Sequence, residues 1–232
     1  MNRKYNICTI ASDIYDEFLF YFVDSCIKNC NNVEKIHILY TGVKIPNYPI
    51  LNNKQIKLHI LEKNIPSTQN IHDENWLANV DSKSVFFKKI SSESSLPTFL
   101  IDVDSYFIKD FINLIDTNKD LVFCKRNHTL PLIASFVGII NNNVAVNFID
   151  SWRNIMKRKS GVKETNSLVE FDELERKNYN IQYIEDEIIS STNFKNPNPD
   201  ICIFHFKGRR IGDVNSQVGE RIKLLKEVVN HV

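Results

Sequence analysis

Short apolar runs alternate with helical patterns along this 232-residue chain. Strands that alternate with helices form a largely parallel sheet covered on both faces, so the pattern predicts an α/β fold with a Rossmann-like layout. The predicted strands cover about 5–11, 35–40, 55–61, 98–103, 120–124, 133–141 and 201–206. The predicted helices cover about 15–30, 84–94, 107–116, 143–158, 168–177 and 217–230. At this length we expect a single domain.

The composition favours a cytoplasmic protein without a nucleic-acid partner. The 29 basic and 28 acidic residues nearly cancel, so no overall field attracts the chain to nucleic acid or to anionic lipid. The N-terminus lacks the apolar region and the cleavage site of a signal peptide, and no apolar stretch is long enough to span a membrane. Five cysteines without a Cys-x-x-Cys pair fit a reducing compartment.

The apolar run at 98–103 ends in two carboxylates one residue apart, Asp102 and Asp104. Because side chains alternate between the faces of a strand, both carboxylates serve one ion only if the strand ends here and the chain turns. Two hard oxygen donors at the carboxyl end of a buried strand suit a divalent cation that holds a diphosphate. The pattern predicts a metal and nucleotide site, although acidic residues also end strands simply for solubility.

The first predicted strand ends in small and polar residues before a helix. Ala11 and Ser12 allow a ligand to approach the backbone, Asp13 offers an acceptor to a ribose or a base edge, and Tyr15 offers a ring for stacking. The alternative is that Ser12 or Asp13 simply caps the following helix.

A lysine pair, Lys88 and Lys89, lies on the helix that precedes the acidic strand. Either lysine is a flexible charge that can reach a phosphate. The alternative is a solvated helix face whose apolar side enters the core.

The last predicted strand ends in His205, which is followed by Lys207 and Gly208 and then by Arg209 and Arg210. An imidazole nitrogen added to two carboxylates favours a manganese-type ion over calcium. Gly208 permits close backbone approach to an anion, and the cations can neutralise it. The alternative is a core histidine followed by a solvated basic turn.

Taken in order, these motifs resemble the GT-A glycosyltransferases of the glycogenin and lipopolysaccharide galactosyltransferase group over nearly the whole chain. The resemblance rests on Ala11-Ser12-x-x-Tyr15, the aromatic-x-Lys helix, Asp102-x-Asp104, Gly138 in the run 135–141, Asp172-Glu173 and His205-x-x-Gly208. It implies one GT-A domain with a nucleotide-binding part at about 1–125, an acceptor part at about 126–200 and a metal and phosphate part at 201–232.

The resemblance also implies a reaction. The donor is a nucleotide sugar, usually UDP-linked, and Mn²⁺ or Mg²⁺ is held by Asp102, Asp104 and His205. Residues implied to meet the donor are Ala11, Ser12, Asp13, Tyr15, Lys88 or Lys89, Asp102, Val103, Asp104, Lys207 and Gly208. The acceptor is a hydroxyl of a glycan or of a lipid-linked glycan in cell-surface synthesis, and transfer with retention is expected. Asp172 and Glu173 are the catalytic candidates, as a general base if inversion occurs and otherwise as groups that orient the sugar.

Three departures from the group affect the sugar contacts. Phe136-Val137-Gly138 stands where the group has Asn-Ser-Gly, and Asp172-Glu173-Leu174 stands where it has Asp-Gln-Asp. Ile211 replaces the lysine expected three residues after Gly208.

Other functions compete with this hypothesis. A phosphatase of the haloacid dehalogenase type also uses Asp-x-Asp after a strand, but it places Thr or Val where this chain has Tyr106 and carries its motif near the N-terminus. A nucleotidyltransferase needs a Gly-rich loop after the first strand, and residues 11–17 contain no glycine. A non-catalytic relative that binds the donor is a further alternative. The apolar face of the helix at 217–230 fits packing on a sheet, with peripheral membrane contact as the alternative.

Overall fold

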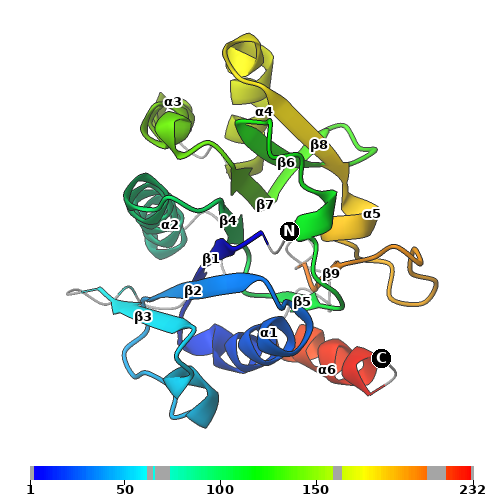
Figure 1. The fold of residues 1–232 in the computed structure, drawn as a ribbon. Coiled ribbons are helices and arrows are strands. Elements are labelled where there is room, and N and C mark those ends of the chain that lie inside the picture. The colour runs from blue at the N-terminus through cyan, green and yellow to red at the C-terminus, as the bar shows by residue number, and fades with distance from the viewer. Residues whose placement is uncertain (1–2, 62–64, 66–73, 159–163, 208–217, 231–232) are drawn as a thin grey trace.

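The computed structural model describes residues 3–61, 65, 74–158, 164–207 and 218–230 (Figure 1). Its strands are β1 (Tyr5–Ala11), β2 (Val33–Tyr40), β3 (Ile56–Ile60), β4 (Thr98–Ile101), β5 (Ser105–Phe107), β6 (Leu121–Lys125), β7 (Leu132–Ile139), β8 (Ile181–Glu185) and β9 (Ile203–His205). Its α-helices are α1 (Asp16–Asn29), α2 (Glu74–Glu93), α3 (Ala145–Arg158), α4 (Glu164–Glu175), α5 (Asp186–Ile189) and α6 (Val218–Val229).

The central sheet confirms the predicted α/β fold. Among the described residues it has the strand order β3-β2-β1-β4-β7-β6-β8. The first four of these strands are parallel, β7 runs antiparallel to both of its neighbours, and β8 is parallel to β6. Parallel strands present their carboxyl ends at one edge, so β1 and β4 end side by side there.

Helices cover both faces of this sheet (Figure 1). On one face, α1 buries Leu19, Phe22 and Val23 in the same cluster as residues of β1 and β2. On the other face, α2, α3 and α4 contribute Phe87, Trp152 and other side chains to a second cluster. Because alternate residues of each buried strand enter different clusters, the strands read as continuous apolar runs in the sequence.

The segment predicted as the last strand does not join the central sheet. It forms β9, which pairs antiparallel with β5 in a separate two-stranded sheet, so that Ser105 lies opposite His205. This pairing also explains why the predicted helix at 107–116 is wrong. The backbone N–H of Phe107 donates to Ser25, that of Ile108 donates to the carbonyl of Cys202, and only a single 3₁₀ turn follows at Ile112–Leu114.

Two further boundaries differ from the prediction. The helix predicted at 84–94 begins ten residues earlier, at Glu74, whereas 62–64 and 66–73 lie outside the described residues. Strand β8 was not predicted, because its short run is mostly half-exposed and lacks a strong apolar pattern.

The C-terminal helix α6 packs into the protein. Val218, Leu225 and Val228 are buried in a third cluster together with Phe18 of α1 and Phe206 after β9. The buried residues of this apolar face are therefore explained by packing within the protein. No helix in the described part of the chain is both long and apolar enough to cross a bilayer.

A buried histidine pair gives the fold a testable pH dependence. His37 of β2 is 7% exposed, and its Nδ1 lies 3.2 Å from Nε2 of His59 in β3. Burial, with repulsion from His59, Lys57 and Lys35, lowers the pKa of His37 to about 4.

The folded state therefore binds fewer protons at this site than the unfolded chain, in which the histidine pKa is about 6.5. The stabilisation is complete above pH ~6.5 and is lost as the pH falls towards about 4, which amounts to about 2 kcal/mol after allowance for solvent screening. Urea unfolding of the wild type and of His37→Gln between pH 7 and pH 4 should show a gap in unfolding free energy that changes by this amount. A gap independent of pH would contradict the prediction.

Candidate active site

The candidate site lies at the carboxyl edge of the central sheet, where β4 ends. The backbone N–H of Asp102 still bonds to the carbonyl of Ser135 in β7, at 3.1 Å, and the chain then turns into β5. Pairing of β5 with β9 carries His205 back to the same place. Residues far apart in the sequence therefore meet here because two short strands pair.

Asp102, Asp104 and His205 each point a potential ligand atom at a common position. These three atoms lie within 4.8 Å of one another. His205 Nε2 is 3.3 Å from Asp104 Oδ1 and 3.8 Å from Asp102 Oδ2. This is the carboxylate and imidazole set predicted from the sequence.

The far side of the imidazole is held in place by hydroxyl groups. His205 Nδ1 lies 3.1 Å from Ser190 Oγ, which in turn lies 2.7 Å from Ser135 Oγ. A hydrogen bond at Nδ1 orients the ring and leaves Nε2 facing the carboxylates, as is usual for a histidine that binds a metal. The donor set and its orientation fit a divalent cation such as Mn²⁺ or Mg²⁺.

Arg221 of α6 pairs with the second carboxylate. Its Nη1 donates to Asp104 Oδ2 at 2.7 Å and to the carbonyl of Phe206 at 3.1 Å, while Nη2 is 3.4 Å from the hydroxyl of Tyr15. The guanidinium also lies over the rings of Tyr15 and Phe18. Burial opposes ionisation of Asp104, but His205 and Arg221 outweigh it, so the pKa of Asp104 is lowered. Asp104 is thus kept as a carboxylate.

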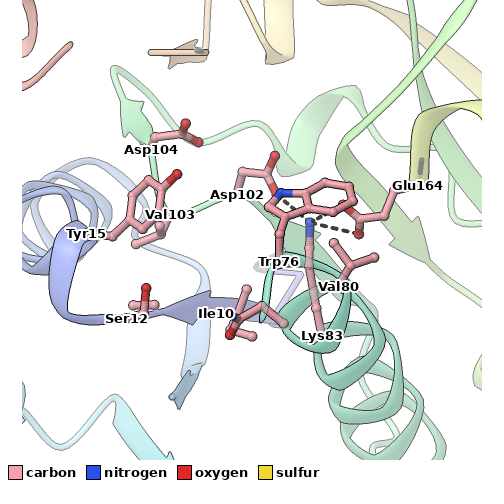
Figure 2. A pocket seen from close by; sticks show the side chains of 12 residues that line it. Ile10, Ser12, Tyr15, Trp76, Val80, Lys83, Asp102, Val103, Asp104 and Glu164 are labelled. Atoms are coloured by element: carbon pink, nitrogen blue, oxygen red, sulfur yellow. Dashed lines mark hydrogen bonds and ion pairs between the residues drawn. The ribbon is translucent and has the colours of Figure 1, made fainter. Parts of the chain in front are cut away.

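Lys83 of α2 pairs with the first carboxylate. The residue is 4% exposed. Its ammonium donates to Asp102 Oδ1 and also lies 3.2 Å from Glu164 Oε1 (Figure 2). Burial disfavours the charged lysine, but Asp102 and Glu164 outweigh it and raise the pKa of Lys83. Burial raises the pKa of Glu164, and the positive charge of Lys83 only partly offsets this increase.

A cavity of about 230 Å³ runs along these groups. Figure 2 shows Tyr15 and Ser12 at one end, Trp76, Lys83 and Glu164 at the other, and Asp102 and Val103 between them. The cavity is lined by Ile10, Ala11, Ser12, Tyr15, Trp76, Asn79, Val80, Lys83, Asp102, Val103, Asp104 and Glu164. It therefore joins an aromatic end to an acidic end past the metal-ligand candidates.

Six residues predicted to meet the donor line this cavity: Ala11, Ser12, Tyr15, Asp102, Val103 and Asp104. His205 and Lys207 line a second cavity, of about 410 Å³, which Arg221 also borders. Gly208, with Arg209 and Arg210, lies outside the described residues.

Three other predicted donor-binding residues point elsewhere. Asp13 accepts hydrogen bonds from the hydroxyl of Tyr40, at 3.0 Å, and from the N–H of Val43, so its carboxylate holds a loop. Lys88 pairs with Asp150 of α3 at 2.6 Å, and Lys89 is exposed. Neither lysine lines the cavity, because α2 turns the face that carries Lys83 towards it.

The catalytic candidates Asp172 and Glu173 are not brought to the cavity either. Both lie on α4, where Asp172 accepts a hydrogen bond from the hydroxyl of Tyr183 and Glu173 is exposed. The acid of α4 that does line the cavity is Glu164, eight positions earlier and about 12 Å away along the helix axis.

Sequence reasoning missed Trp76, Asn79, Val80, Lys83 and Glu164. The first four recur at three- and four-residue spacing on one face of α2, which is a helical signal. Starting the predicted helix at 84 hid that signal. Glu164 carries no local signal, since nothing in its neighbourhood distinguishes it from the other acids of α4.

The chain matches no protein-family model and no curated protein. Its fold is similar to that of solved glycosyltransferases. The galactosyltransferase LgtC, solved with donor and acceptor sugar analogs, superposes with a TM-score of 0.63 at 12% identity, over 98% of this chain and 96% of LgtC. The glycosyltransferase GlyE of Streptococcus pneumoniae TIGR4 gives a TM-score of 0.59 at 14% identity, over 99% of this chain and 63% of GlyE. The bifunctional glycosyltransferase WbbM gives 0.58 at 10% identity, over 99% of this chain and 52% of WbbM.

These superpositions confirm the predicted resemblance at the level of the fold: the chain has the α/β fold of GT-A glycosyltransferases, in a single domain that spans LgtC almost completely.

The buried Arg221–Asp104 pair leads to a stability prediction. Arg221→Met leaves a buried carboxylate without its cation, so we expect a loss of about 3 kcal/mol in unfolding free energy. Lys226→Met on the same helix removes an ion pair with Glu17, in which the lysine is half-exposed, and should cost far less because solvent screens that pair. Equal losses for the two variants, measured by urea unfolding at pH 7, would contradict the prediction.

Proposed function

We propose that this protein is a metal-dependent glycosyltransferase that moves a sugar from a nucleotide-sugar donor, UDP-linked, to a hydroxyl of a glycan or a lipid-linked glycan. The observation that carries the proposal is the cluster of Asp102, Asp104 and His205 beside a cavity with an aromatic end, in a glycosyltransferase fold. The cell-surface role and transfer with retention rest on the resemblance of the sequence motifs.

Each end of the cavity suits one part of such a donor. Tyr15 offers a ring to the base, and the small Ala11 and Ser12 leave room for the ribose. Asp102, Asp104 and His205 would hold the divalent cation, which supplies positive charge to the departing diphosphate. Arg221 keeps Asp104 ionised and oriented for that task. Lys207, close to both carboxylates, is a further cation for the phosphates.

Glu164 takes the part that the sequence suggested for Asp172 and Glu173. Its carboxylate lies at the end of the cavity away from Tyr15 and is held by Lys83. An acid in this position accepts hydrogen bonds from sugar hydroxyls and so orients the sugar for attack by the acceptor.

The proposal predicts nucleotide binding that depends on a metal. UDP titrated calorimetrically into the protein should bind at least ten-fold more tightly with Mn²⁺ than with EDTA, because Asp102, Asp104 and His205 would hold the cation and the cation would supply positive charge to the diphosphate. Equal affinity with and without the metal, or no binding of UDP, would contradict it.

Variants assign this effect to the cluster. Asp104→Asn and His205→Gln should each abolish the gain from Mn²⁺, and the second keeps the test valid if loss of the Arg221 pair unfolds the first. Asp150→Asn is the matched control, since its carboxylate pairs with Lys88 away from the cavity. Circular dichroism checks that each variant is folded.

A further inference from the structure

The two ends of the cavity differ in chemistry, which orients a bound donor. Tyr15 lies at one end, and the Lys83 and Glu164 pair lies at the other (Figure 2). Asp102, one of the metal-ligand candidates, lies between them. If the base occupies the aromatic end and the diphosphate meets the metal, the sugar extends to the end with Lys83, Glu164 and Trp76. This orientation rests on the function proposed above.

At that end, Lys83 is the cation among the described cavity-lining residues, and it is already paired. Lys83 has three N–H donors, and carboxylate oxygens of Asp102 and Glu164 take two of them. Lys83 as a residue is 4% exposed, so a ligand has little access to it. Among the described residues that line the cavity, the charges are Lys83 against Asp102, Asp104 and Glu164.

We propose that the sugar of the donor is uncharged, and that this Lys83, Asp102 and Glu164 cluster selects neutral hexoses against uronic acids and other acidic sugars. A carboxylate on the sugar would meet the negative oxygens of Asp102 and Glu164, and the described residues that line the cavity offer no second cation to pair with it. Like charges at such a site are strongly unfavourable. Hydroxyl groups of a neutral sugar can instead donate to the carboxylates of Asp102 and Glu164.

Glu164 is the carboxylate partner of Lys83 and adds a negative charge to this end of the cavity. The indole of Trp76 lies across the same end and offers an apolar face to the C–H groups of a sugar ring (Figure 2). Both features favour a neutral, hydroxyl-rich ligand.

Matched donor pairs test the proposal, because UDP-glucose and UDP-glucuronate, like UDP-galactose and UDP-galacturonate, differ only at carbon 6. We expect each uronate to bind at least ten-fold more weakly than its neutral partner, measured by calorimetry with Mn²⁺ and with UDP as the reference. Uronates that bind as tightly as the neutral sugars, while UDP itself binds, would overturn this inference alone. Failure of UDP to bind would overturn the proposed function as well.

A substitution at Glu164 tests the role of the cluster. Glu164→Gln removes one negative charge and should reduce the neutral-to-uronate affinity ratio at least three-fold. Glu175→Gln, the same change at the other end of α4, should leave the ratio unchanged, since that side chain bonds Asn178 away from the cavity. A ratio unaffected by Glu164→Gln would overturn the assignment to this cluster.

Discussion

The site depends on the pairing of two neighbouring carboxylates, Asp102 and Asp104, with buried cations. Each has its own cation from a different helix: Lys83 of α2 pairs with Asp102, and Arg221 of α6 pairs with Asp104. Burial alone would raise the pKa of Asp104, and His205 and Arg221 oppose this effect. Lys83 and Arg221 each bind one oxygen of their carboxylate. The other oxygen of Asp102 and of Asp104 faces His205 and remains available to a divalent cation.

These ion pairs connect the site to the rest of the fold. Arg221 bonds the backbone after β9 and lies over Tyr15, so docking of α6 and the shape of the aromatic end are linked through one side chain. Lys83 links α2 to the start of α4 through Glu164. The helices that cover the sheet therefore also determine the charges at its carboxyl edge.

The polar residues at the ends of the first and fourth strands were predictable, because parallel strands in such a fold end at one edge. Residues placed by helix rotation were harder to predict. The motif order favoured Lys88 and Asp172, but α2 turns Lys88 towards Asp150, and α4 carries Asp172 away from the cavity, where it bonds Tyr183. A helix that turns about 100° per residue changes the role of a side chain with a shift of one or two positions. The prediction of a helix at 107–116 was wrong for another reason. The backbone at the start of this segment forms hydrogen bonds with β9 and its neighbours instead of helical ones.

Local sequence patterns were enough to predict the α/β class, the strand that ends in Asp102 and Asp104, and the apolar run that ends in His205, because these features depend on where apolar residues stop. The pairing of β5 with β9 brings His205 to those carboxylates, and helix packing surrounds them with Lys83, Arg221 and Glu164. Partners that are 19 to 117 residues apart leave no local pattern in the chain. Their pairing follows from how helices pack on the sheet, and this depends on side-chain contacts over the whole core.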